Sequence, residues 1–230
     1  MSNGPTRQSV LGTLVDRAVC MPYAKPQVLR RGHRRHRDAE DSHWKSVATI
    51  REDVGQAASF IAGSLKSRGA RRAWSTAEVA LDPAGPWWPK PRGDFFELDS
   101  ESREWAMERL ETTADRAAEC LQDEAVDRDW GWLWSQPSFA APGKMRPSIT
   151  RPDLVGGLDR TRCDVLDLKI TSQADLGPAV TEKQTKSFLS WATSLRALGF
   201  APMNCWVLAV SATDERYQWT EFPTAAEDTV

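Results

Sequence analysis

Hydrophobic residues recur at helical spacing in four parts of the chain. Apolar positions three and four residues apart predict helices over residues 9–20, 42–68, 100–127 and 181–198. The last of these stops before Gly199, and a glycine at this position commonly ends a helix. Seven acidic residues line the outer face of the 100–127 helix, so we expect that face to avoid a polyanion.

Continuous or alternating apolar runs predict strands elsewhere. We expect one at 163–170, one at 203–211 and one at 73–81. A fourth, at 130–134, alternates tryptophan with other residues, so its three tryptophans should share one side of the strand. Proline and glycine are dense between residues 82 and 94, which predicts an extended loop there.

Length and composition are those of a globular protein. At 230 residues the chain can form one large domain, or one domain with an insertion, around a substantial core. The formal net charge of −2 does not by itself indicate nucleic-acid binding, although a local basic strip can still bind DNA. The four cysteines form no Cys-x-x-Cys pair, so we expect reduced thiols in a cytoplasmic protein. We expect no membrane partner, since no signal peptide and no apolar run of membrane length is present.

A carboxylate and an Asp-x-Lys triplet carry the candidate chemistry. Asp153 follows a proline, and fourteen residues later Asp167 begins the sequence Asp-Leu-Lys that ends at Lys169. On the expected strand at 163–170, Asp167 and Lys169 project from one face, whereas the alternating leucine and isoleucine side chains face a core. Two carboxylates and an ammonium gathered at one point suit a hard divalent cation and an activated water.

The string RPDLVGGLDRTRCDVLDLKIT, from Arg151 to Thr171, resembles the PD-(D/E)xK nuclease superfamily. Within it, the string is most similar to the RecB-like branch, which includes CRISPR-associated RecB-like exonucleases. In that branch a strand with the pattern GxxDxxD runs through a turn into a strand ending VVDYKT. The resemblance implies metal-binding aspartates at Asp153 and Asp167, a metal-binding carbonyl at Leu168 and a catalytic lysine at Lys169.

The helix at 9–20 is similar to a second motif of that branch, LGTLVHRVLE, whose histidine can reach the metal. Asp16 stands where the histidine would be, and Cys20 stands where many members have glutamate. An aspartate is a hard, anionic ligand that suits Mg²⁺ or Mn²⁺. His36 is the alternative counterpart, because it lies in a comparable glycine, histidine and glutamate spacing. The sequence does not decide between Asp16 and His36 as the counterpart of that histidine.

The helix at 181–198 occupies the place of the branch's QxxxY helix. One register keeps the glutamine as Gln184 and replaces the tyrosine with Phe188, whereas a register starting at Ser187 loses both polar residues. In the first register Gln184 is a catalytic-site residue that orders a phosphate or the attacking water. Lys183 and Lys186 beside it are then expected to contact phosphates.

A basic run lies between the first two expected helices. It holds five arginines within eight residues, and such a run is either a solvated surface or a phosphate-contacting strip. We expect DNA contacts from four of them: Arg30, Arg31, Arg34 and Arg35.

The resemblance implies a restriction-endonuclease-like fold of the α/β class, in which helices flank a central mixed β-sheet. We expect a single nuclease domain over 1–230, with a helical and tryptophan-rich insertion at 42–135 and a flexible tail at 222–230. Some members hold an iron–sulfur cluster through three closely spaced late cysteines. This chain lacks that triplet, so we expect none.

The implied activity is Mg²⁺- or Mn²⁺-dependent hydrolysis of phosphodiester bonds in DNA. The expected role is that of an exonuclease in recombination, repair or phage DNA processing, with a protein partner in such a system. Two alternatives stay open: a defence or restriction-type endonuclease, and a non-catalytic DNA-binding subunit that keeps the nuclease fold.

Overall fold

Helices and strands succeed one another in the order of an α/β protein. The computed structural model describes residues 4–23, 47–66, 89–135, 139–140, 149–150, 152–159, 161–172, 176, 182–197 and 199–223. The helices are α1 (Arg7–Cys20), η1 (Met21–Tyr23), η2 (Val47–Thr49), α3 (Ile50–Lys66), α5 (Pro89–Glu97), α6 (Ser100–Asp127) and α7 (Glu182–Ala197). The strands are β1 (Trp132–Ser135), β2 (Phe139–Ala140), β3 (Ile149–Thr150), β4 (Leu154–Asp159), β5 (Arg162–Thr171), β6 (Pro202–Ser211) and β7 (Tyr217–Pro223).

Local side-chain chemistry fixes where the helices begin and end. Thr6 and Ser9 form a reciprocal capping box at the start of α1, with backbone-to-hydroxyl distances of 3.1 and 3.2 Å. Asp99 caps α6 by accepting the Ser102 amide at 2.7 Å. Gly199 follows α7 with a φ of 85°, a left-handed conformation that glycine adopts without strain. The expected helix boundaries at 100–127 and before Gly199 are therefore confirmed.

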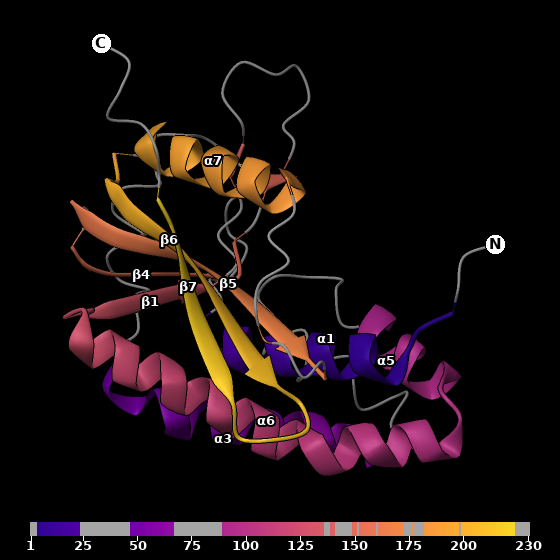
Figure 1. The fold of residues 1–230 in the computed structure, drawn as a ribbon. Helices are drawn as coiled ribbons and strands as arrows, with labels where there is room; N and C mark the ends of the chain where they lie inside the picture. The colour runs from indigo at the N-terminus through magenta and orange to yellow at the C-terminus, as the bar shows by residue number, and fades with distance from the viewer. Residues whose placement is uncertain are drawn as a thin grey trace.

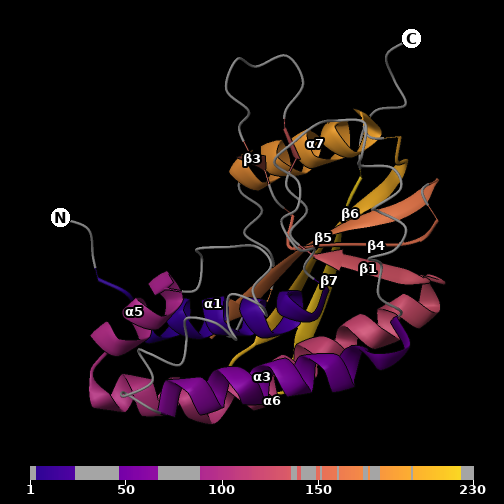
Figure 2. The ribbon, with the colours of Figure 1, turned by 180° about the vertical axis from the view of Figure 1, so that it is seen from behind.

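Five strands form a mixed sheet in the order β1-β4-β5-β6-β7. The pairing of β5 with β6 is parallel, and the other three pairings are antiparallel. Helix α7 connects β5 to β6, as parallel neighbours require a crossover connection. Figure 1 shows α7 on one side of the sheet and α1, α3 and α6 on the other, and Figure 2 shows the same layers from behind.

Each face of the sheet has its own hydrophobic core. In the first core, α1, α3 and α6 pack on one another and on the sheet residues Leu166 and Leu168. In the second, Phe188 and Leu195 of α7 pack on the opposite face, where Val165 projects. The protein is thus an α/β structure with a five-stranded mixed sheet flanked by helices, as expected for the fold class.

The tryptophans around β1 do not share one side, so that prediction is wrong. Trp132 and Trp134 lie in the core under α7, whereas Trp130 lies in the core under α6. The alternation rule fails because the strand begins only at Trp132. Trp130 precedes it and follows Asp129, whose φ of 59° redirects the chain after α6.

Two further elements differ from expectation. Residues 89–94 of the predicted loop at 82–94 belong instead to α5, which begins at Pro89, while residues 82–88 lie outside the described residues. Prolines are tolerated in a first helical turn because the amides there lack partners within the helix, and Phe95 anchors the helix in the first core. Strand β7 was not predicted, although its aromatic residues at 217, 219 and 222 were an available signal.

The expected strand at 73–81 and residues 42–46 and 67–68 of the expected second helix lie outside the described residues. The rest of that helix is present as η2 and α3. Within the described parts of the chain, no helix is both long and apolar enough to cross a membrane. All four cysteines are free and buried, in agreement with the expectation of reduced thiols.

Candidate metal centre

The candidate site begins where the pairing of β4 with β5 ends. Among the described residues no strand pairs with β5 on this side beyond Leu166, and we call this stretch the open edge of β5. The ladder between these strands starts at the pair Leu154–Leu166, and from there to Thr171 β5 is paired with β6. Asp153 directly precedes β4, and its Oδ2 accepts a hydrogen bond from the Leu168 amide at 2.7 Å. A strand residue directs its N–H and C=O to the same side, so the Leu168 carbonyl also faces the open edge.

Asp167 and Lys169 project from the sheet face opposite the leucines, as the strand pattern predicts. Leu166 and Leu168 are buried in the first core, on the face that carries α1, α3 and α6. Asp167 projects from the other face and is also buried, at 6% exposed. The Lys169 Nζ lies 2.6 Å from Asp167 Oδ2 and donates to the Leu168 carbonyl at 3.4 Å. The Lys169 side chain is 46% exposed, so the ion pair has one partner at the surface and one, Asp167, that is buried.

Helix α1 brings Asp16 to the same place. The helix packs directly on β5, because a Cβ built on Gly12 would lie 3.7 Å from the Cβ of Ile170. One turn later, Asp16 lies within electrostatic range of Asp153, Asp167 and Lys169. Of the two counterparts considered for the family histidine, the structure therefore brings Asp16 into the cluster.

Cys20 joins α1 to the hairpin, a contact that sequence analysis missed. Its Sγ donates to Asp16 Oδ1 at 3.3 Å and to the Asp153 carbonyl at 3.4 Å. Ser135 of β1 donates to the Cys20 carbonyl at 2.5 Å, which fixes the end of the helix. The available signal was the spacing of Asp16 and Cys20, since residues four apart share one helix face.

The carboxylates of Asp16, Asp153 and Asp167 place an excess of negative charge at a half-buried to buried site. Burial raises the pKa of Asp153 well above its usual range, and the carboxylates of Asp16 and Asp167 raise it further. Burial likewise raises the pKa of Asp16, against the opposing effect of Arg17. Burial lowers the pKa of Lys169, but the neighbouring carboxylates outweigh it and the net shift is upward. Among the described residues, the three carboxylates of Asp16, Asp153 and Asp167 thus have only Arg17 and Lys169 as neighbouring positive charges. A bound divalent cation would relieve the repulsion among the carboxylates.

The donor chemistry suits a hard cation, although the side chains are turned to other partners. Among the described residues, no three His, Cys, Asp or Glu side chains already stand together as metal ligands. Asp153 is turned to the Leu168 amide, Asp16 to Cys20 and Asp167 to Lys169. The Asp167–Lys169 ion pair is short but poorly directed, so the buried Asp167 Oδ2 accepts no hydrogen bond of ordinary geometry there. Carboxylate and carbonyl oxygens are preferred ligands of Mg²⁺ and Mn²⁺, which would bind after these side chains rotate.

Helix α7 places the remaining candidate residues on the side of the sheet that carries Asp167. Gln184 is half-buried and lies one turn before Phe188, which packs on that face in the second core. Lys186 is exposed, and only the backbone of Lys183 is described. The candidates Arg30, Arg31, Arg34, Arg35 and His36 lie outside the described residues.

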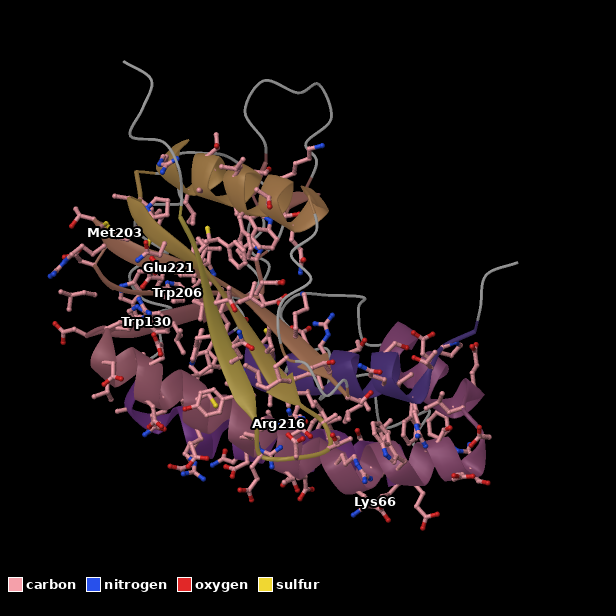
Figure 3. All side chains as sticks on the ribbon, in the orientation of Figure 1. Lys66, Trp130, Met203, Trp206, Arg216 and Glu221 are labelled. Carbon is pink, nitrogen blue, oxygen red and sulfur yellow. The ribbon has the colours of Figure 1, made fainter. Side chains whose placement is uncertain are left out.

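A second buried carboxylate, Asp164, belongs to a structural cluster. Its oxygens accept the Trp130 indole N–H at 3.0 Å and the Asn204 amide at 3.2 Å. The Arg128 guanidinium lies 4.0 Å from the same carboxylate and stacks 3.6 Å above the ring of Trp206. Figure 3 labels Trp130 and Trp206 next to each other, and both belong to the first core, which the sheet shares with α1, α3 and α6. The Asp164 carboxylate therefore already has a charged partner and two hydrogen-bond donors, and we assign it a structural role in the core.

Comparison with protein-family models, curated proteins and solved structures finds no match for this chain.

Proposed function

We propose that the protein is a metal-dependent nuclease that hydrolyses phosphodiester bonds in DNA. The observation that carries the proposal is the meeting of α1 with the β4–β5 hairpin. Cys20 and Asp153 are 133 positions apart in the sequence, yet the Cys20 thiol donates a hydrogen bond to the Asp153 backbone carbonyl. Two motifs that resemble RecB-like nucleases at separate places thus contribute to one carboxylate cluster.

The fold supports the same proposal. A five-stranded mixed sheet with helices on both faces is compatible with a restriction-endonuclease-like core. In that core the Asp153 and Asp167 carboxylates would flank the open edge of β5. We infer that the chain is a member of the RecB-like branch of PD-(D/E)xK nucleases, and that it works in the cytoplasm with partners in recombination, repair or phage DNA processing.

The residues have distinct roles in this mechanism. Asp153, Asp167 and Asp16, together with the Leu168 carbonyl, would hold Mg²⁺ or Mn²⁺. When bound, the metal ion polarises the scissile phosphate and lowers the pKa of its water ligand. The Leu168 amide fixes one oxygen of Asp153, which orients that carboxylate toward the edge of β5.

Lys169 supplies the positive charge beside the reacting phosphate. Its raised pKa keeps the ammonium protonated at neutral pH, and its pairing with Asp167 holds it at the cluster. There it stabilises negative charge that develops on the phosphate and orients the attacking water. Gln184, on the same side of the sheet, would position the water or a phosphate oxygen.

Cleavage of end-labelled DNA tests the proposal. We expect the purified protein to degrade linear DNA with Mn²⁺ or Mg²⁺ and to lose this activity in EDTA. Asp167→Asn and Lys169→Ala should each lower the rate by about 100-fold or more, because each removes preorganised charge from the reacting centre. Asp123→Asn, an exposed carboxylate on α6, is the matched control and should keep full activity.

The outcomes also separate the alternatives. Cleavage of closed circular DNA would identify an endonuclease of the defence or restriction type. DNA binding without metal-dependent cleavage would identify a non-catalytic subunit. Full activity in folded Asp167→Asn or Lys169→Ala protein would overturn the assignment of the centre.

A further inference from the structure

Arg17 of α1 lies at the carboxylate cluster but forms no ion pair with the described residues. Burial raises the pKa of Asp16, and the charge of Arg17 opposes this shift more strongly than any other group. Arg17 also opposes the rise that burial imposes on the pKa of the Cys20 thiol, three residues later on the helix. The guanidinium is therefore close to the cluster, although no described carboxylate is in salt-bridge contact with it.

The hydrogen bonding of Arg17 is incomplete. Its Nε is buried and has no hydrogen-bond partner among the described residues. The adjacent Asp16 is turned away, because its Oδ1 accepts the Cys20 thiol at 3.3 Å. A buried donor without an acceptor costs folding free energy, so its presence indicates that an acceptor arrives with a ligand.

Two other cations show how the fold usually treats such groups. The Lys169 Nζ lies 2.6 Å from the carboxylate of Asp167. Arg51 of α3 pairs with two carboxylates of α6, at 3.1 and 3.0 Å. Arg17, in contrast, is a guanidinium without a bound anion beside a site that must accept a phosphate. An anionic backbone approaching three carboxylates needs positive charge of this kind.

We propose that Arg17 binds a backbone phosphate of the DNA strand next to the metal centre. The inference rests on the proposed function, because it assigns a substrate contact of the same centre. A guanidinium donates two parallel hydrogen bonds to phosphate oxygens, which fixes the orientation of the phosphate as well as balancing its charge. A metal ion on Asp16 would neutralise that carboxylate and leave the Arg17 fork to the phosphate.

The salt dependence of DNA binding tests this contact without relying on cleavage. Fluorescence anisotropy follows the binding of a labelled duplex to the full-length protein, with Ca²⁺ in place of Mn²⁺, as the salt concentration rises from about 50 to 200 mM. Each phosphate contact adds about 0.9 to the slope of log affinity against log salt, because binding releases counterions. Arg17→Gln should therefore lower this slope by about 0.9 and weaken binding roughly tenfold at the lowest salt.

Three further variants make the result specific. Arg17→Lys keeps the charge but not the planar fork, so it should keep the slope and recover part of the affinity. Arg51→Gln removes a guanidinium that carboxylates already hold, and it should bind DNA as the wild type does. Arg17→Met keeps the apolar stem of the side chain and takes the place of Arg17→Gln should that variant fail to fold. A wild-type slope in a folded, uncharged Arg17 variant, or an equal loss in Arg51→Gln, would overturn the inference.

The two proposals fail in different ways. Metal-dependent cleavage by a protein whose salt slope is the same with and without Arg17 would leave the nuclease assignment intact and refute the phosphate contact. A slope that depends on Arg17, in a protein that cleaves no DNA with Mn²⁺ or Mg²⁺, would establish the contact and refute the nuclease.

Discussion

Asp153→Asn is expected to stabilise the metal-free protein while it removes a metal ligand. The substitution keeps an oxygen that can accept the Leu168 amide and removes only the charge. Burial raises the pKa of Asp153 above the usual 3.8, and the charges of Asp16 and Asp167 add to this effect. Ionised Asp153 therefore costs folding free energy in the absence of a cation.

The magnitude follows from linkage between protonation and folding. Each unit by which folding raises a carboxyl pKa costs about 1.4 kcal/mol at a pH above both values. We expect a gain of about 1–3 kcal/mol for Asp153→Asn at pH 8, after allowance for the partial exposure of this side chain. In a protein of this size that gain corresponds to a rise in Tm of roughly 2–12 °C.

The sign of the pH dependence is fixed by the direction of the shift. Below the unfolded pKa of 3.8 both states of the wild type are protonated, and the variant has no advantage. As the pH rises through that value, the unfolded state releases its proton first, so wild-type stability falls. The advantage of Asp153→Asn therefore grows with pH until it passes the raised folded-state pKa, where it levels off.

Thermal unfolding in EDTA, followed by circular dichroism between pH 4 and 8, measures this difference. Asp159→Asn is the control on the same hairpin: Thr161 hydrogen bonds lower the pKa of Asp159, so this variant should show no gain. Mn²⁺ at about 100 times its dissociation constant should stabilise the wild type by about 2.7 kcal/mol and so raise its Tm, whereas the same concentration should leave the Tm of Asp153→Asn unchanged. A folded Asp153→Asn protein less stable than wild type at pH 8 would refute the reasoning.

Two further predictions concern the packing that holds the hairpin in place. A Cβ at Gly156 would lie 2.8 Å from the Trp130 ring, so Gly156→Ala should lower stability by about 1–3 kcal/mol in urea unfolding. Gly55→Ala in α3, where the new methyl meets open space, should instead gain about 0.5–1 kcal/mol, and equal effects at both sites would contradict this packing. Arg128→Met removes the cation beside buried Asp164 and should cost about 1–3 kcal/mol at pH 7 by the same measurement, a loss that shrinks at low pH as the carboxyl is protonated.

Local sequence patterns determined most of the elements and half of the candidate site. Helical spacing located α1, α6 and α7, because each must bury an apolar stripe. Strand alternation placed Asp167 and Lys169 on the face opposite the leucines of β5. These relations depend on neighbours within one element, so the sequence alone expresses them.

The tertiary structure decided how the elements meet. The turn after α6 decided which face of the sheet Trp130 packs on, and local alternation did not predict it. The helix that begins at Pro89 likewise depended on the burial of Phe95 in the first core. The Leu168 amide is free to bond Asp153 because the ladder between β4 and β5 ends at the pair Leu154–Leu166, two positions before Leu168. No local pattern records where a neighbouring strand begins.

The sequence by itself therefore determined which residue types lie on each face of β5, and so where a carboxylate and an ammonium stand side by side. Only the tertiary structure brought Asp16 and Cys20 to Asp153, since that contact spans 133 positions and depends on how α1 packs against the sheet. Periodicity specifies what an element buries but not its partner. The physical reason is that apolar burial is non-directional, whereas the site depends on directed contacts between elements.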